Sequence, residues 1–173
     1  MSNPLDLKDK RVLVVGLARS GVAAACLCVR QGAAVVAADK RSEKELGDAA
    51  RTLKTLGVEL VTGPHDEEVF RSCDLMVVSP GVSLALPAIE AARAAGVPVI
   101  GEVELASRFL EGPILGITGT NGKSTTTSLT GCLCEKAGLR TFAGGNLGRP
   151  LSEAALVGGV WDAIVCELSS FQL

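Results

Sequence analysis

Residues 11–21 read Arg-Val-Leu-Val-Val-Gly-Leu-Ala-Arg-Ser-Gly, a short apolar run that ends in a turn bounded by two glycines. Runs rich in valine favour a buried β-strand, because β-branched side chains pack well on a pleated sheet. An alanine- and leucine-rich segment follows the turn and favours a helix. This succession recurs along the chain, which predicts β–α–β units and therefore an α/β fold with a parallel sheet.

The predicted strands are short and continuously apolar, as is typical of parallel strands that are covered on both faces. We expect them at Arg11–Val15, Ala34–Ala38, Val58–Val61, Leu75–Val78, Pro98–Ile100, Ile114–Thr118, Thr141–Ala143 and Ala163–Cys166. Helices are expected between them at Gly21–Gln31, Glu43–Leu56, Pro87–Ala95, Val103–Phe109, Lys123–Ala137 and Pro150–Leu156.

Two domains are expected, because a second glycine-rich loop opens directly after the strand at Ile114 and one domain rarely needs two phosphate loops. We expect a Rossmann-like domain at residues 1–110 and the start of a P-loop α/β domain at residues 111–173. The second unit is too small to bury a complete core. The chain is therefore expected to be a truncated piece of a longer protein.

The composition argues against several classes of protein. The 173 residues include 17 basic and 19 acidic side chains, a formal net charge of −2, and no basic face of the kind that binds nucleic acid or anionic membranes. The longest uncharged apolar run, Val22–Val29, is far shorter than the roughly 20 residues of a membrane span. Residues 1–6 lack the basic start and apolar stretch of a signal peptide. We expect a soluble, cytoplasmic protein.

The chain contains six cysteines and a single histidine. The cysteine pairs at 26 and 28 and at 132 and 134 lie in predicted helices, where residues two apart do not face each other. The Cys-x2-Cys spacing of zinc sites is absent, and His65 lies in a turn far from both pairs and is given no role. We expect buried, reduced thiols that behave as small hydrophobic side chains.

The first glycine-rich turn has the strand–turn–helix context of a dinucleotide fingerprint. Gly16 allows a tight turn, Gly21 allows helix and strand to pack closely, and the helix N-terminus offers N–H groups to a diphosphate. Ala18, however, replaces the glycine that permits close approach to a pyrophosphate. Asp39, at the end of the second strand, is placed to accept a hydrogen bond from a ribose or a base. A diphosphate nucleotide other than a nicotinamide dinucleotide is favoured; an ordinary βα turn and NAD binding remain open.

A further turn, Ser79-Pro80-Gly81, follows the fourth predicted strand. Ligands bind beyond the carboxyl ends of strands in open α/β sheets, so this turn can present N–H groups to a phosphate. Taken alone, it is better explained as an ordinary βα turn with no ligand.

The second loop carries the most specific signal in the sequence: Gly119-Thr120-Asn121-Gly122-Lys123-Ser124-Thr125 lies between a predicted strand and a predicted helix. Its glycines let backbone N–H groups surround phosphates, Lys123 supplies a positive charge, and the Ser124 hydroxyl suits Mg²⁺. Ile117 departs from the strict P-loop pattern, which has glycine there. Glu167 ends a later strand, where P-loop proteins hold magnesium with a carboxylate; a helix-capping role for it remains open.

These loops resemble those of the Mur ligase family and its folylpolyglutamate synthase relatives, in which the isoleucine at position 117 is shared. Within that group, the branch that adds D-glutamate is the most similar. Its motifs are matched by Gly16 to Gly21, Ser79 to Gly81, Gly119 to Thr125, Gly144-Gly145-Asn146-Leu147-Gly148 and Glu167-Leu168-Ser169-Ser170-Phe171-Gln172-Leu173.

The resemblance implies an ATP-dependent ligase of peptidoglycan synthesis that joins D-glutamate to UDP-N-acetylmuramoyl-L-alanine through an acyl phosphate. The implied site residues fall into three sets. Those for the UDP precursor are Arg19, Ser20, Asp39, Arg41, Ser79 and Gly81, with Asn146 and Gln172 for its muramoyl-alanine part. Those for ATP are Gly119, Thr120, Asn121, Gly122, Lys123, Ser124 and Thr125. Ser124 and Glu167 would hold Mg²⁺, and Lys123 and Glu167 are the implied catalytic residues.

Three rival interpretations remain open at the level of the sequence. A Rossmann module that senses NAD(H) does not account for Ala18 or for Lys123. A P-loop kinase or GTPase predicts glycine at position 117 and leaves residues 1–110 unexplained. A sister Mur or folylpolyglutamate ligase would differ around Glu167. Because the family's amino-acid-binding domain is absent, we expect this chain to bind the UDP precursor without catalysing ligation.

Overall fold

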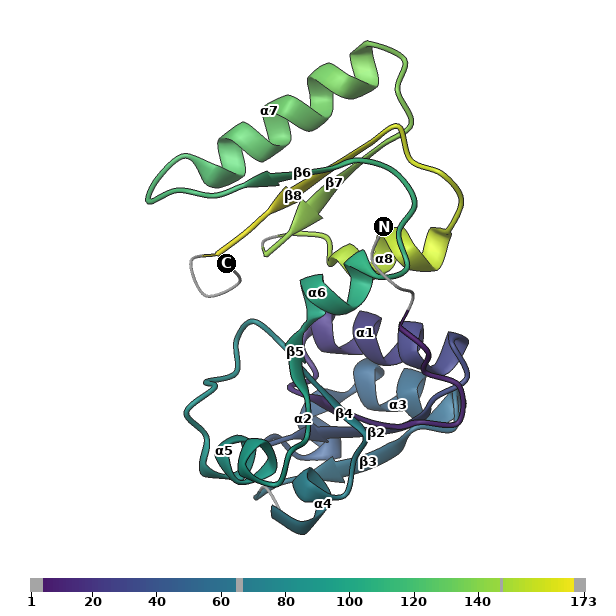
Figure 1. Cartoon of the computed structure of the whole chain (residues 1–173), viewed down its shortest axis with the longest axis vertical. Coiled ribbons are helices and arrows are strands. Elements are labelled where there is room, and N and C mark those ends of the chain that lie inside the picture. The colour runs from purple at the N-terminus through teal and green to yellow at the C-terminus, as the bar shows by residue number, and fades with distance from the viewer. Residues whose placement is uncertain (1–4, 65–66, 147, 170–173) are drawn as a thin grey trace.

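The computed structural model describes residues 5–64, 67–146 and 148–169, which form two parallel sheets with helices packed around them (Figure 1). The strands are β1 (Arg11–Val15), β2 (Ala34–Asp39), β3 (Glu59–Thr62), β4 (Leu75–Val78), β5 (Val99–Gly101), β6 (Ile114–Ile117), β7 (Thr141–Gly145) and β8 (Ala163–Glu167). The helices are α1 (Arg19–Arg30), α2 (Glu43–Leu46), α3 (Asp48–Thr55), α4 (Glu67–Arg71), α5 (Pro87–Ala94), α6 (Glu102–Ser107), α7 (Lys123–Lys136) and α8 (Leu151–Val157).

The first sheet has the strand order β3-β2-β1-β4-β5, and all of its strand pairs are parallel. Residues 12–15 of the central strand are completely buried. Their side chains alternate between two apolar clusters, one shared with α1, α3 and α6 and the other with α4 and α5. The α/β class with a parallel sheet, predicted from the sequence, is confirmed.

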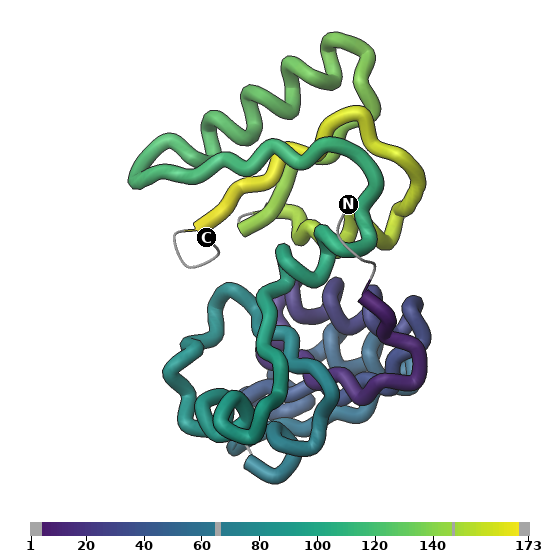
Figure 2. Tube along the Cα trace, in the orientation of Figure 1, coloured from purple at the N-terminus to yellow at the C-terminus, as the bar shows by residue number. Residues whose placement is uncertain are grey.

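The second sheet has the order β6-β8-β7 and is also parallel. Helix α7 packs on it, and α8 lies against α1 and α6 of the first sheet's layer (Figures 1 and 2). Strand β6 is an edge strand of this sheet, and its Ile114 and Leu115 side chains are each exposed by about two fifths.

The two sheets share one apolar cluster across the α1–α6–α8 contact. It includes Leu105 of α6, Leu151 of α8 and Phe142 of β7, all completely buried. Polar contacts accompany it, among them a hydrogen bond from the Arg30 guanidinium to the Leu156 carbonyl oxygen. The second sheet is therefore packed onto the first by both apolar and polar contacts.

Two elements differ from the sequence-based prediction. The single helix predicted at Glu43–Leu56 is wrong: it is divided into α2 and α3 at Gly47, whose φ of +56° does not belong to a right-handed helix. Helix α4 was not predicted, because five residues are too few to display a helical period.

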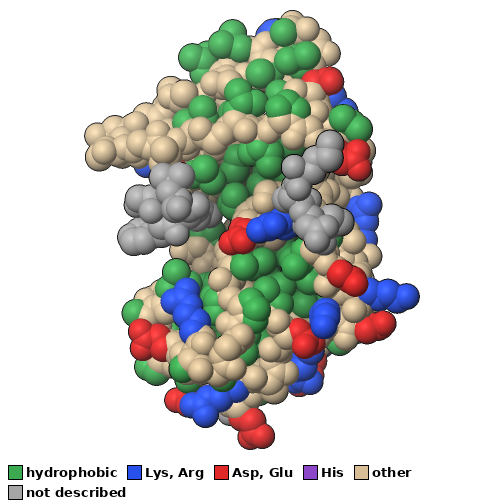
Figure 3. Space-filling view, in the orientation of Figure 1, with side chains coloured by type: hydrophobic (Ala, Val, Ile, Leu, Met, Phe, Trp, Pro, Cys, Tyr) green, Lys and Arg blue, Asp and Glu red, His purple; other side chains and the backbone are tan. Residues whose placement is uncertain are grey.

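The structure also corrects the expectation that all six cysteines are buried. Cys28, Cys73 and Cys166 are buried, but Cys26 and Cys134 are half-buried and Cys132 is exposed on α7, so uniform burial of the thiols is wrong. The same helix exposes Leu129 and Leu133, and hydrophobic side chains gather at this end of the molecule in Figure 3.

Within the described ranges, no helix is long and apolar enough to cross a bilayer.

Candidate functional site

The turn between β1 and α1 lies between the ends of two neighbouring strands. Because β1 pairs with both β2 and β4, residues that follow those strands flank the turn. Ser79, directly after β4, donates a hydrogen bond from its hydroxyl to the Gly16 carbonyl oxygen at 2.7 Å. The chain leaves β1 toward β2 and returns to β4 on the other side, and ligands of open α/β sheets bind at such a crevice.

Close packing in this turn depends on glycine. A Cβ atom at Gly21 would lie 1.8 Å from the Gly16 carbonyl oxygen and 2.7 Å from the Ser79 hydroxyl oxygen. Gly16 has a φ of +87°, a conformation that glycine adopts with little strain. Both glycines therefore have the backbone roles that the sequence predicts for them.

Asp39, at the end of β2, holds the turn from the other side. Its carboxylate accepts the Leu17 N–H at 2.7 Å and the Arg41 N–H at 2.9 Å. The Arg41 side chain donates two further hydrogen bonds, from Nε at 3.0 Å and from Nη2 at 2.8 Å. Burial acts to raise the pKa of Asp39, but these hydrogen bonds outweigh it and lower the pKa to about 2. The carboxylate is ionised and fixes both Arg41 and the turn.

Arg19 and Ser20 begin α1, and no side chain caps this end of the helix. The first N–H groups of a helix have no partner within it, and together with the helix dipole they favour an anionic ligand. The exposed Arg19 side chain extends toward α8, where its Nη2 lies 2.9 Å from Oε1 of Glu153. This pairing joins residues 134 positions apart, and nothing in the sequence indicates it.

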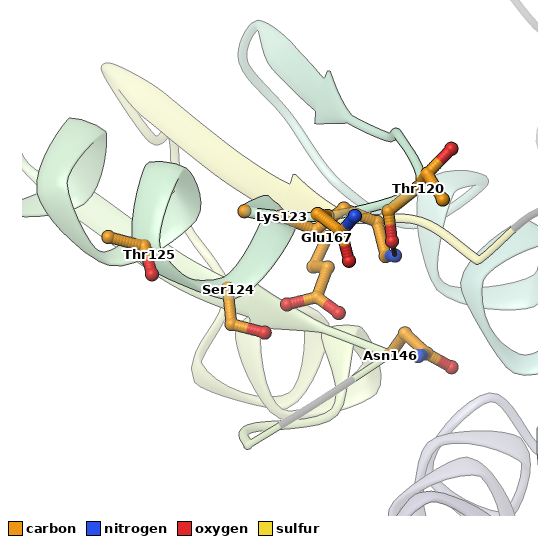
Figure 4. Close-up of a pocket in the computed structure, with 8 residues that line it drawn as sticks. Thr120, Lys123, Ser124, Thr125, Asn146 and Glu167 are labelled. Atoms are coloured by element: carbon orange, nitrogen blue, oxygen red, sulfur yellow. Dashed lines mark hydrogen bonds between the residues drawn. The ribbon is translucent and has the colours of Figure 1, made fainter.

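A cavity of about 310 Å³ lies at the carboxyl edge of the second sheet (Figure 4). It is lined by Thr120, Asn121, Gly122, Lys123, Ser124, Thr125, Asn146 and Glu167. The structure thus brings six of the seven predicted P-loop residues, all but Gly119, together with Asn146 directly after β7 and Glu167 at the end of β8. In Figure 4 the Glu167 carboxylate points into the space between Ser124 and Asn146.

Lys123 begins α7 and folds over its own loop. Its ammonium group donates a hydrogen bond to the Gly119 carbonyl oxygen at 2.7 Å and lies 3.4 Å from that of Thr120. Gly122, in a left-handed conformation, precedes α7, and no side chain caps this helix. The loop therefore presents a positive charge and an uncapped helix N-terminus to the same cavity.

Glu167 ends the central strand of the second sheet, paired with Ile117 on one side and Gly145 on the other. The side chain is 2% exposed, and Oε1 is buried with no hydrogen-bond partner among the described residues. Leaving a buried carboxylate oxygen unpaired is unfavourable, and such an oxygen is a preferred ligand of Mg²⁺. The donor set of Glu167 and the Ser124 hydroxyl therefore fits a magnesium ion.

The described residues contain no group of three His, Cys, Asp or Glu side chains able to hold a metal ion.

A second cavity, of about 760 Å³, lies beside the β4–α5 loop. Ser79 and Gly81 line it, together with Ser169 of the last matched motif and with Arg93 and Glu104, for which the sequence gives no functional signal. The other predicted precursor residues of the first unit lie outside both cavities. Gln172, also predicted to contact the precursor, lies outside the described residues.

Residues 10–101 match the family described as Mur ligase MurD-like, N-terminal domain. The UDP-N-acetylmuramoylalanine–D-glutamate ligase of Myxococcus xanthus is 61% identical over 170 residues, which cover 98% of this chain and 37% of that protein. The protein of the same name from Anaeromyxobacter dehalogenans is 60% identical over 169 residues, 97% of this chain and 36% of that one. The chain thus spans little more than a third of the length of these relatives.

Solved structures show the same fold at much lower identity. A murein peptide ligase from Psychrobacter arcticus superposes with a TM-score of 0.58 at 18% identity, over 94% of this chain and 39% of the other. A UDP-N-acetylmuramate–alanine ligase from Thermotoga maritima gives 0.52 at 21% identity, over 92% and 37%. Since the MurD-like N-terminal domain matches more than half of the 173 residues, the chain belongs to the Mur ligase family and to its MurD-like group.

Proposed function

We propose that this chain is part of an ATP-dependent amide ligase that adds D-glutamate to UDP-N-acetylmuramoyl-L-alanine in peptidoglycan synthesis. The observation that carries the proposal is the convergence of the P-loop, Asn146 and Glu167 on one cavity. The names of relatives about 60% identical to the chain support the choice of substrates. In this proposal residues 1–110 bind the UDP precursor, and residues 111–173 supply the P-loop of an ATP-binding domain.

The proposed reaction has two steps because a carboxylate does not react with an amine in water. An oxygen of the L-alanine carboxylate attacks the γ-phosphorus of ATP, and ADP leaves, which gives an acyl phosphate. The amine of D-glutamate then attacks the acyl carbon, inorganic phosphate leaves with the transferred oxygen, and the amine nitrogen loses its proton. The first step brings two anions together and therefore requires neutralisation of charge.

The P-loop residues neutralise this charge. In the proposed complex the Lys123 ammonium leaves the Gly119 carbonyl oxygen and binds the β- and γ-phosphates. The N–H groups at the start of α7 surround the same phosphates. Ser124 and Glu167 would hold Mg²⁺, which when bound supplies further positive charge beside the transferred phosphoryl group. Holding both substrates in line contributes much of the remaining rate acceleration.

The precursor is proposed to lie along the carboxyl edge of the first sheet. The uncapped N-terminus of α1, with Arg19 and Ser20, binds its diphosphate. Arg41, held by Asp39, contacts the uracil end, and Ser79 and Gly81 close over it. Asn146, with Gln172, contacts the muramoyl-alanine part next to the P-loop.

Calorimetric titration of the chain with UDP-N-acetylmuramoyl-L-alanine tests this proposal, with NADH as the comparison ligand. Gly81→Val is the variant of choice, because a Cβ atom there meets no protein atom within 4 Å and the variant should fold. We expect the precursor to bind, NADH not to bind, and Gly81→Val to weaken precursor binding by about 10-fold or more. Ala137→Val adds similar bulk at the exposed end of α7 and should leave binding unchanged.

NADH binding without a response to the precursor would overturn the proposal in favour of a dinucleotide sensor. Equal precursor binding by the wild type and Gly81→Val would show that the site lies elsewhere.

A further inference from the structure

Glu102 is a buried carboxylate at the contact between the two sheets. It begins α6 and is 1% exposed. Its Oε1 accepts the N–H of Ser152, 50 residues further along the chain, at 2.6 Å. The charge on Glu102 also contributes to the raised pKa of Cys166 in β8, after the larger effect of burial. Glu102 therefore contacts the second unit through Ser152 of α8, although it belongs to a helix of the first.

The partner of Glu102 is the buried backbone at the start of α8. Pro150 occupies the N-cap position, and no side chain caps α8 from within its own sequence. Proline has no side-chain acceptor, so the first N–H groups of this helix need a partner from elsewhere. Burial raises the pKa of Glu102 above its usual value, although hydrogen bonds from Ser152 and from the backbone of Leu151 act to lower it. Glu102 thus supplies the cap that α8 lacks.

Directly before α8 lies the segment named here the Asn146 loop, of which the structure describes residues 144–146 and 148–149. The Gly145 N–H donates a hydrogen bond to the Arg149 carbonyl oxygen at 2.8 Å, and the Asn146 N–H donates one to the Glu167 carbonyl oxygen at 2.9 Å. A Cβ atom at Gly145 would lie 2.4 Å from that same Glu167 oxygen. Residues 145 and 146 are therefore packed against the strand that carries Glu167, and Gly145 is joined to Arg149 at the end of the loop next to α8.

The far end of the loop is also fixed by side chains. Arg149 places its guanidinium over the Phe142 ring, 4.5 Å from the ring centre, and its Nε lies 3.2 Å from Oε2 of Glu153. The other oxygen of Glu153 pairs with Arg19. The loop is consequently held to the first sheet's layer through α8, by Glu102 at Ser152 and by Glu153, the next residue in the helix.

We infer that Glu102 is a positioning residue: by capping α8 from the first unit, it fixes the Asn146 loop at the P-loop cavity in the place where the sugar–alanine part of the precursor must lie. The inference rests on the proposed function for the identity of the ligand. It adds a residue that touches neither substrate and acts only through the backbone of α8. A carboxylate in α6 thus joins the nucleotide-binding unit to the site of the chemistry.

The positioning role can be measured without any ligand, by amide hydrogen exchange at Gly145 and Asn146. We expect Glu102→Ala to speed exchange of these amides by about 10-fold, because the buried hydrogen bond that caps α8 is lost. Glu102→Gln retains a side-chain oxygen of the same reach and should restore exchange to within about twofold of the wild type. Leu105→Ala, at a completely buried position in the same helix, is the control for loss of packing alone.

Two results would overturn the positioning role. One is unchanged exchange at Gly145 and Asn146 in Glu102→Ala. The other is an equal increase in Leu105→Ala when the two variants are compared at temperatures that give them equal global stability.

The ligand-dependent part is tested by titrating each variant with UDP and with UDP-N-acetylmuramoyl-L-alanine. Since Glu102 acts on the Asn146 loop, Glu102→Ala should weaken binding of the full precursor by about 10-fold and that of UDP by less than about twofold. Equal weakening for the two ligands, or none, would refute the assignment to the sugar–alanine part. If the wild type binds neither ligand, the proposed function fails, while the exchange result still decides whether Glu102 positions the loop.

Discussion

Asp39 and Ser79 hold the backbone of the β1–α1 turn from the ends of the two strands that flank β1. Asp39 accepts a hydrogen bond from the Leu17 N–H, and Ser79 donates one to the Gly16 carbonyl oxygen. Each is a polar side chain that is about 5% exposed, so its bonds form in surroundings where an unpaired partner would be unfavourable. The β1–α1 turn is therefore fixed before any ligand arrives. At this scale, the residues proposed to bind the precursor also stabilise the fold.

The closeness of Gly21 to the turn predicts a large effect from a single methyl group. Gly21→Ala should lower the free energy of unfolding by about 1–3 kcal/mol or more, because the new carbon overlaps the Gly16 carbonyl oxygen. Urea denaturation measures the change. Gly81→Ala is the control, since a Cβ atom there meets nothing within 4 Å and should have little effect on stability. Equal midpoints for the two variants would contradict the close contact.

The lowered pKa of Asp39 predicts how stability depends on pH. A carboxyl group with a pKa of about 2 in the folded chain stabilises it above the unfolded pKa of about 3.9, and the contribution disappears as the pH falls through 2. At pH 7 the shift corresponds to about 2 kcal/mol, of which roughly half should remain at pH 3. Asp39→Asn should therefore destabilise the chain at pH 7, and the difference from the wild type should shrink as the pH falls.

Urea denaturation of both proteins at pH 7, 5 and 3 provides the measurement. A difference in unfolding free energy that stayed constant from pH 7 to pH 3 would mean that the ionised carboxylate is not the source of the stabilisation.

Helix α7 packs on the second sheet with one face and exposes apolar side chains on another. It buries Thr127 and Gly131 against the second sheet, whereas Leu129 and Leu133 are exposed by about three fifths. Apolar side chains on this outer face contribute little to the stability of the chain, because folding does not remove them from water.

Leu133→Lys should consequently change the free energy of unfolding by less than about 0.5 kcal/mol. It should also reduce the fluorescence of a dye that binds exposed apolar surface, such as ANS. Leu151→Ala, at a completely buried position, should instead cost about 2–5 kcal/mol. A clear fall in stability for Leu133→Lys would show that the outer face of α7 is covered in solution.

The strands could be predicted well from the sequence, since valine-rich runs such as residues 11–15 and 75–78 are bounded by clear turn residues. The ends were less certain: β7 continues to Gly145 and β8 to Glu167, because pairing with a neighbour outweighs the weak strand preference of glycine and glutamate. The interruption at Gly47 could not be predicted, because the composition of residues 43–56 favours a helix throughout. In the structure the positive φ of Gly47 divides this segment into two helices.

Part of the candidate site could be predicted from the sequence and part could not. The P-loop could be predicted because its residues are consecutive, so their spacing can be recognised in the sequence itself. The Arg19–Glu153 and Glu102–Ser152 contacts could not, because they join residues 134 and 50 positions apart through the packing of α8. Such pairs arise from tertiary structure alone, and no local pattern indicates them.

The whole molecule shares one apolar cluster between its two sheets, which predicts that they unfold together. Trp161 is the sole tryptophan of the chain and lies buried in the second unit. Its fluorescence therefore follows that unit, while far-ultraviolet circular dichroism follows all the helices. We expect both signals to change at the same urea concentration, because separating the units would expose residues such as Leu105 and Leu151.

Two separate midpoints would show that the contact between α1, α6 and α8 is too weak to couple the sheets. In that case the fluorescence change, which comes from the smaller sheet, should occur at the lower urea concentration.

The order of strands in the second sheet has a consequence for the nascent chain on the ribosome. Strands β6 and β7 do not pair with each other; each pairs only with β8, which is synthesised after both. The sheet therefore cannot assemble during translation until residues 163–167 have emerged, and the apolar strands made earlier remain without partners until then. Glu167 is the last residue of β8, so the pairing of β8 that completes the sheet also places the carboxylate of the site.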